Sequence, residues 1–269
     1  KVRLPVGLNS DQSRVSTSSF SEPFDHLVIS KKPIKVVSHL LRLRSLEGPS
    51  LTHSPVFHHP TGRWRPRWRG RIHGGASIVT IPAGIVLIIA ARGVTATLAT
   101  SVYVVSLFAL FSLSAAYHLF ARTERSQRVM QRVDHSMVYV LIAGTYTPVC
   151  LLGLPRRIGI GYLIVVWFSA CARIVLKVRW KGTKTSAALY LIIGWAIVFA
   201  IPSIYNNIGA VGLSLYAMGG LVFTIGAVLF YLQRPKLKPD VFGFHELWHT
   251  LTVIAVLLQF CAAAVLITR

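Results

Sequence analysis

Histidines inside apolar stretches are the residues of this chain best suited to chemistry. His118 ends one apolar run, with Ser114 four residues before it, and His245 and His249 open the last apolar run. A spacing of four residues places the two members of each pair on one face of a helix. Because ionisable side chains are costly in an apolar environment, their presence there indicates a functional site.

Three imidazoles suit a zinc ion, which in catalytic sites keeps three protein ligands and a water molecule. We therefore predict that His118, His245 and His249 bind zinc. Asp134 would hold or polarise the bound water, and Ser114 would hydrogen-bond to that water or to Asp134. Zinc lowers the pKa of bound water to about 7, which provides hydroxide for hydrolysis. The alternative is that the histidines are structural polar links between helices.

The composition indicates which elements position these residues. Of the 269 residues, 53% are hydrophobic and only 14% are charged, and the mean hydropathy is +0.58. Soluble domains are about one-quarter charged, so an integral membrane protein is expected. The net charge of +21 would suit nucleic acid, but the basic residues lie in the first 71 positions and mostly between apolar runs. That distribution is typical of membrane loops, and no nucleic-acid partner is expected.

Residues 1–71 form a basic segment rich in Ser, Pro, Arg and His, without a helical or strand period. Such a segment buries too little apolar surface to offset its ordering entropy, so we expect it to be largely disordered. Its final part, 63–69, alternates Arg and Trp. We interpret this run as a juxtamembrane anchor on anionic lipid rather than a nucleic-acid contact.

Residues 72–269 contain seven apolar segments, each near the roughly 20 residues that cross a hydrocarbon core of about 30 Å. Since backbone groups in lipid must be satisfied internally and no barrel-type alternation is visible, these segments are expected to be helices. The predicted fold class is all-α, a polytopic seven-helix membrane bundle. The segments are 74–91, 95–120, 136–154, 158–176, 186–205, 209–232 and 245–268. Pro148 should kink the third helix or end its regular part.

Loop charges predict the orientation. The expected loops 121–135, 177–185 and 233–244 hold eleven Lys and Arg residues, and the basic N-terminal segment lies on their side. The opposite side holds four, Arg92, Arg156, Arg157 and Arg269. The positive-inside rule therefore places the N-terminus in the cytoplasm and the C-terminus outside.

This topology brings distant polar residues to one depth. His118 ends the second helix near the cytoplasmic face, where Asp134 starts the third helix and His245 and His249 start the seventh. The zinc site is therefore expected near the cytoplasmic face. His135 points about 100° away from Asp134 and is interpreted as an interfacial or supporting group rather than a fourth ligand.

Several motifs over roughly 200 residues, from about Trp68 onward, resemble the hemolysin III family, the bacterial branch of the progestin and adipoQ receptor (PAQR) group. The matching motifs are Pro66-Arg-Trp-Arg-Gly-Arg-Ile-His73, Ser114-Ala-Ala-Tyr-His118, Asp134-His-Ser136, Ala143-Gly-Thr-Tyr-Thr-Pro148, Gly194-Trp195, Gly219-Gly220, Arg234-Pro235 and Phe242-Gly-Phe-His-Glu-Leu-Trp-His249. The resemblance implies seven membrane helices with the N-terminus inside, in a plasma or inner membrane. It also implies a zinc site at the three histidines named above.

Related receptors are similar to alkaline ceramidases, so the resemblance implies zinc-dependent hydrolysis of an amide or ester in a membrane lipid. Asp134 would shuttle the proton in that reaction. One alternative is a receptor or signalling module with a structural zinc ion, and another is a cytolytic, pore-type protein. The string His245-Glu-Leu-Trp-His249 also matches the H-E-x-x-H protease signature, which makes an intramembrane metalloprotease a minor alternative.

Overall fold

The computed structural model describes residues 66–179, 186–238 and 240–268. These residues are helical apart from short connections, and an isolated bridge between Lys238 and Phe242 is the one β-type pairing among them. The prediction of an all-helical fold is confirmed for this part of the chain. The N-terminal segment expected to be disordered lies outside the described residues except for 66–71, where a turn leads into the first described helix.

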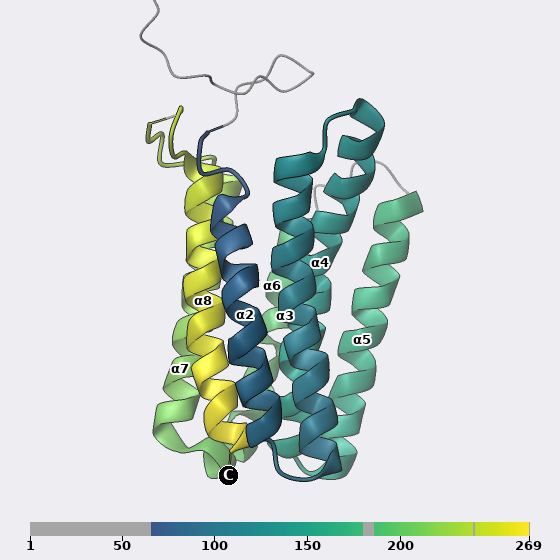
Figure 1. Ribbon diagram of the computed structural model, residues 1–269. Coiled ribbons are helices and arrows are strands. Elements are labelled where there is room, and N and C mark those ends of the chain that lie inside the picture. The colour runs from purple at the N-terminus through teal and green to yellow at the C-terminus, as the bar shows by residue number, and fades with distance from the viewer. Residues whose placement is uncertain (1–65, 180–185, 239, 269) are drawn as a thin grey trace, which may run out of the picture. The chain divides into compact units, whose positions relative to one another are not determined.

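The helices pack side by side as a bundle (Figure 1). They are α2 (Arg71–Ala90), α3 (Val94–Phe120), α4 (Glu124–Leu152), α5 (Arg156–Arg179), α6 (Ser186–Trp195), the 3₁₀ helix η1 (Ala196–Ala200), α7 (Ile201–Tyr231) and α8 (Phe244–Ile267). Helices adjacent in sequence pack together from α2 to α5, and α7 packs along α8. Because α2 also packs against α8, the first and last described helices are neighbours.

Helix α4 lies at the centre of the bundle, since it contacts α3, α5, α6 and α8. Every residue from 141 to 150 is buried, as expected for a helix surrounded on all sides. The helix continues through Pro148 to Leu152, so the expected end of its regular part at Pro148 is not observed. Thr145 and Thr147 donate side-chain hydrogen bonds to the carbonyls of Leu141 and Ala143 on the preceding turn.

The start of α4 differs from the sequence-based expectation of a loop over 121–135. The helix begins at Glu124 because Thr123 provides an N-cap: the Ser126 N–H donates to the Thr123 hydroxyl at 3.1 Å, and the Thr123 N–H donates to the Ser126 hydroxyl at 3.0 Å. Glu124 in the first turn pairs with Arg128 one turn later. The polar residues of this stretch are therefore helical and extend α4 beyond its apolar part.

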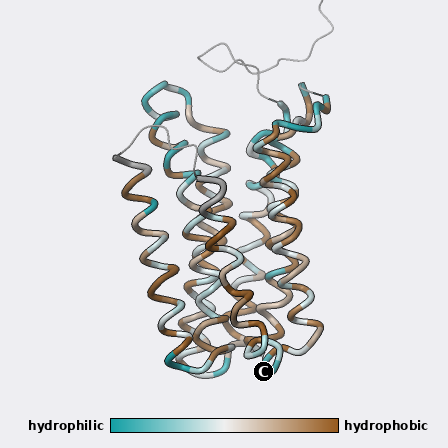
Figure 2. The backbone as a smooth tube through the Cα atoms, turned by 180° about the vertical axis from the view of Figure 1, so that it is seen from behind, coloured by the Kyte–Doolittle hydropathy of each residue, from teal (hydrophilic) through white to brown (hydrophobic). Residues whose placement is uncertain are grey.

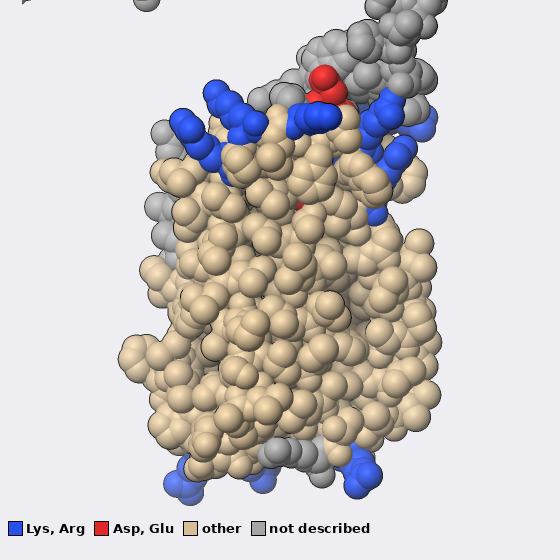
Figure 3. Space-filling view, turned by 90° about the vertical axis from the view of Figure 1, so that its left-hand side faces the viewer, with Lys and Arg blue, Asp and Glu red and all other residues tan. Residues whose placement is uncertain are grey.

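The outer surface of the bundle is apolar where lipid would meet it. Ile78, Val86 and Ile89 on α2, for example, are each more than half exposed. Hydrophobic residues occupy the middle of the helices (Figure 2), and on the face seen in Figure 3 the Lys and Arg side chains gather at the two ends. Within the described residues, six helical stretches are long and apolar enough to cross a membrane, which makes this a multi-pass membrane protein.

The expected fifth and sixth segments fall within one helical stretch, Tyr190–Tyr231, of 42 residues. The helical φ/ψ pattern breaks inside it at Gly209, where φ is 66° and ψ is −173°. Only glycine adopts such a conformation at no steric cost. The described helices thus provide six candidate crossings, with a break in the longest of them, and they do not confirm the seventh.

Close packing between α3 and α4 requires a glycine at position 144. A Cβ atom added to Gly144 would lie 1.9 Å from the Ser106 hydroxyl oxygen and 2.5 Å from its Cβ. We expect Gly144→Ala to lower the free energy of unfolding by about 1–3 kcal/mol, because the two helices must separate. Thermal unfolding in detergent measures the change.

The matched control is Gly161→Ala on α5, where a Cβ meets nothing within 4 Å. That change should leave stability unchanged or raise it by up to about 1 kcal/mol, since alanine is the better helix former. Equal effects at the two positions would contradict the packing argument.

Candidate metal centre

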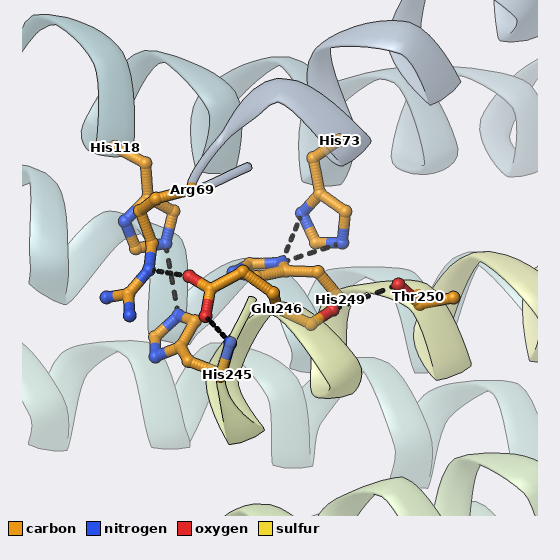
Figure 4. A network of polar contacts seen from close by, with 8 residues as sticks. Arg69, His73, His118, His245, Glu246, His249 and Thr250 are labelled. Atoms are coloured by element: carbon orange, nitrogen blue, oxygen red, sulfur yellow. Dashed lines mark hydrogen bonds and ion pairs between the residues drawn. The ribbon is translucent and has the colours of Figure 1, made fainter. Parts of the chain in front are cut away.

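Three buried or half-buried histidines meet at one end of the bundle. His118 lies in the last turn of α3, and His245 and His249 lie in the first two turns of α8. Because α3 ends where α8 begins, residues 127 or more positions apart in the sequence come together. Their rings lie beside one another in Figure 4.

The distances among the three rings define a compact cluster. The Nε2 atoms of His118 and His245 are 3.3 Å apart. The ring centroid of His249 lies 5.0 Å from that of His118 and 4.7 Å from that of His245. One potential ligand atom from each residue can be chosen so that all three lie within 4.8 Å of one another. The cluster predicted from the sequence is therefore present and could hold a metal ion.

The donor set fits a tetrahedral metal ion. Two nitrogens that each lie about 2.05 Å from such an ion are about 3.3 Å apart, which is the separation of the His118 and His245 nitrogens. The Nε2 atom of His249 is buried and has no hydrogen-bond partner among the described residues. Since buried polar atoms are normally satisfied, this unpartnered nitrogen is suited to coordinate an ion.

Asp134 lies on α4, ten residues after its start at Glu124, and is not part of the group of clustered ligand atoms. The Ser114 hydroxyl lies near its carboxyl group but forms no hydrogen bond of normal geometry with it. Ser114 lies four residues before His118 on α3, and therefore on the same face of that helix. His135, the next residue on α4, is within electrostatic range of His245. The roles predicted for Asp134 and Ser114 stay predictions.

The Glu246 carboxylate is engaged in contacts that stabilise the start of α8. It is fully buried, and its carboxylate accepts hydrogen bonds from the Arg69 guanidinium and from the Gly243 N–H, the latter at 2.8 Å. Both oxygens are therefore engaged in holding the start of α8 (Figure 4). A glutamate committed in this way is a poor general base, which removes the main support for the H-E-x-x-H protease interpretation.

The chain before α2 pairs with the segment that leads into the start of α8. The N–H groups of Arg67 and Trp68 donate to the carbonyls of Asp240 and Val241, at 3.3 and 3.4 Å. Trp68 is half exposed, as an interfacial anchor would be. Gly70 has a φ of +80°, and a Cβ there would lie 2.8 Å from the Cβ of His118. A glycine is therefore needed where this segment passes the metal centre.

Arg69 and His73 belong to this site, although the sequence did not predict them as site residues. Arg69 pairs with Glu246 across 177 positions, and His73 contacts His249 across 176. The sequence held a signal, because Glu246 lies within an apolar segment and His73 directly precedes one. Neither partner could be identified without knowing that α2 packs against α8.

Comparisons with known proteins identify the family of this chain. Residues 62–260 match the family described as haemolysin-III related. Hemolysin-3 of Bacillus cereus is 35% identical over 182 residues, which cover 66% of this chain and 80% of that protein. The hemolysin-3 homolog of Bacillus subtilis (strain 168) is 29% identical over 183 residues, covering 66% and 83%. All the motifs of the metal centre fall within the matched residues.

Removing Arg69 alone should leave the Glu246 carboxylate buried without its cation. We expect Arg69→Met to lower the free energy of unfolding by about 2–4 kcal/mol, somewhat less than for a fully buried pair because 22% of the Arg69 side chain is exposed. The double variant Arg69→Met/Glu246→Gln should recover most of that loss, since a neutral amide still accepts from Gly243. Thermal unfolding in detergent gives the comparison.

The exposed pair between Arg128 and Glu124, 3.1 Å apart, is the matched control. Arg128→Met should change stability by no more than about 0.5 kcal/mol, because exposed ion pairs contribute little. A double variant as unstable as Arg69→Met would show that the charge of Glu246 is not the cause.

Proposed function

The chain belongs to the haemolysin-III related family, and we propose that it is a membrane enzyme that hydrolyses an amide or ester bond in a lipid with the help of zinc. The observation that carries this proposal is the cluster of His118, His245 and His249, whose ligand atoms lie within 4.8 Å of one another. Three nitrogen ligands leave a fourth position open for a water molecule, as in catalytic rather than closed structural zinc sites.

A zinc ion held by three imidazoles supplies a Lewis acid for the substrate carbonyl and a water whose pKa falls to about 7. Asp134 accepts a proton from the attacking water at its carboxylate and delivers it to the leaving nitrogen or oxygen. Ser114 lies near that carboxylate and donates its hydroxyl proton to it once the site is assembled, which orients the proton acceptor. Each role is one that the residue's chemistry and position permit.

The lipid substrate follows from the surroundings of the site. The histidines lie at one end of helices whose outer surfaces are apolar, so a lipid can keep its chains beside the bundle while its polar linkage reaches the histidines. The excess of Lys and Arg in the connections at this end assigns it to the cytoplasmic face by the positive-inside rule. The polar head of the substrate would then lie in the cytoplasmic leaflet.

We also propose that the chain crosses the membrane seven times, with its N-terminus in the cytoplasm and its C-terminus outside. The stretch Tyr190–Tyr231 has 42 residues, which as one straight helix would span about 63 Å. A hydrocarbon core of about 30 Å needs half of that length. The non-helical conformation at Gly209 supports two crossings separated near this residue.

The names of the relatives favour a second candidate, because one is called hemolysin-3 and the other a hemolysin-3 homolog. Lysis could follow from a pore or from hydrolysis of membrane lipid. The two are separated by leakage of a dye from liposomes that contain the protein. Leakage that persists in histidine variants without zinc would favour the pore.

Metal content tests the proposal directly. Purified wild type should hold about one zinc ion per chain by mass spectrometry, whereas His118→Ala and His249→Ala should lose it, because two nitrogens bind zinc much more weakly than three. The matched control is His135→Ala, which removes an imidazole beside the cluster that is not assigned as a ligand and should keep the metal. If wild-type protein purified without any chelator contains no zinc, the proposal is overturned.

Activity then separates an enzyme from a structural metal site. In reconstituted vesicles, wild type should release fatty acid from ceramide-like amides or from glycerol esters, and Asp134→Asn should keep zinc but lose about 100-fold or more of the rate. If Asp134→Asn hydrolyses lipid as fast as wild type, another group moves the proton. Zinc without hydrolysis of any lipid class would instead favour a structural ion in a receptor or signalling protein.

Cysteine labelling tests the proposed topology. In a background with Cys150, Cys171 and Cys261 replaced, Asn206→Cys should react with a membrane-impermeant maleimide from outside intact cells. Lys236→Cys should react only after the membrane is permeabilised. An unreactive Asn206→Cys under both conditions would instead place this region within the membrane.

A further inference from the structure

His73 occupies the first turn of α2 and is almost fully buried, with 3% of its surface exposed. Its ring is perpendicular to that of His249, with the centroids 3.9 Å apart. The Nδ1 atom of His249 lies 2.9 Å from both ring nitrogens of His73, a hydrogen-bond distance to either (Figure 4). A fourth histidine thus touches the cluster without being one of its ligands.

This contact decides which nitrogen of His249 is left for a metal ion. A neutral imidazole carries a proton on one nitrogen and a lone pair on the other. The Nδ1 atom faces His73, whereas the Nε2 atom is buried without a hydrogen-bond partner among the described residues. The rings of His118 and His245 lie 5.0 and 4.7 Å away. The available ligand atom of His249 is therefore Nε2.

We propose that His73 is a positioning residue of the metal centre. It accepts the Nδ1 proton of His249 and so keeps the Nε2 lone pair directed toward the other two histidines. Ligating histidines commonly donate their second N–H to an outer partner, which selects the tautomer and fixes the ring. Here that partner is a neutral imidazole from α2. The inference rests on the proposed metal binding and adds that His73 orients His249, one of the three ligands.

The position of His73 is itself set by its neighbours. The ring of Phe111, a fully buried residue on α3, meets the His73 ring edge-on with the centroids 5.1 Å apart. One turn before His73, Arg69 is bound to Glu246, which lies three residues before His249 on α8. Two contacts in succession therefore join α2 to α8 and hold His73 against the ligand.

The experiment compares two substitutions that differ in their ability to accept a proton. His73→Leu removes the acceptor and keeps a buried side chain, whereas the amide oxygen of His73→Gln can still accept. Zinc affinity is measured on the full chain in detergent by competition with a chromophoric chelator. We expect His73→Leu to weaken zinc binding about 10- to 100-fold, as loss of such an outer partner does, and His73→Gln to restore most of the affinity.

Thr80→Val is the matched control. Thr80 is the other buried polar side chain of α2 and hydrogen-bonds only within its own helix, to the Ala76 carbonyl at 2.8 Å. Its substitution removes a buried hydroxyl two turns from His73 and should leave zinc affinity at the wild-type value. An equal loss in Thr80→Val would mean that any disturbance of α2 weakens the site, which would overturn the proposal.

Thermal unfolding separates positioning from mere packing. With excess chelator, wild type and His73→Leu should unfold within a few degrees of each other, whereas the rise in Tm on adding zinc should be smaller in His73→Leu. A large loss of Tm in chelator with unchanged zinc affinity would assign His73 a packing role only. If His73→Leu does not fold, His73→Ala is compared with His73→Gln in the same way.

The two proposals fail differently. If wild type binds no zinc, both the metal centre and the role of His73 are overturned. If wild type binds zinc and His73→Leu binds it equally well, only the role of His73 is overturned. Equal affinities of His73→Leu and His73→Gln, both below wild type, would rule out the hydrogen bond as the cause.

Discussion

A carboxylate without exposed surface must be neutralised and hydrogen-bonded where it lies, and the architecture around the metal centre depends on that requirement at Glu246. Glu246 sits in the first turn of α8 and accepts from the backbone of Gly243 and from Arg69. Arg69 can reach Glu246 only if the chain before α2 crosses beside the start of α8. Its backbone contacts to residues 240–241 hold it there. That crossing places His73 against His249 and brings the glycine at position 70 past His118.

The bundle also gathers its buried histidines and the Arg69–Glu246 pair at one end of otherwise apolar helices. Around residues 141–150 of α4 the interior is mostly apolar; its threonines bond to their own helix, and the Tyr146 hydroxyl bonds to the backbone at Ile193 and Ile197. The histidines of the cluster, His73 and the Arg69–Glu246 pair gather where α3 ends and where α2 and α8 begin. If the proposed metal ion binds there, it lies at the polar end of the bundle, where the polar linkage of a lipid could reach it without crossing the hydrocarbon core.

The sequence predicted those contacts that follow from helix periodicity and from the alternating direction of successive membrane helices. The four-residue spacing of His245 and His249, together with alternating helix direction, was enough to bring His118 to them. The start of α4 was not predicted, because the polar residues of 121–135 are also typical of a loop. Thr123 and Ser126 nevertheless form a recognisable capping pair. The Arg69–Glu246 and His73–His249 contacts depend on which helices are neighbours in three dimensions. The lengths and hydropathies of the segments do not contain that information.

The pairing of α2 with α8 also has a consequence for biosynthesis. Arg69 and Glu246 are separated by 177 residues, which at about 5–20 residues per second corresponds to about 10–35 s of translation. During that interval α2 has left the ribosome while its partner helix does not yet exist. Glu246 can be buried with its counter-charge only after the 177 residues that follow Arg69 have been made. The three-histidine cluster can therefore form only after α8 has been made and has packed beside the end of α3.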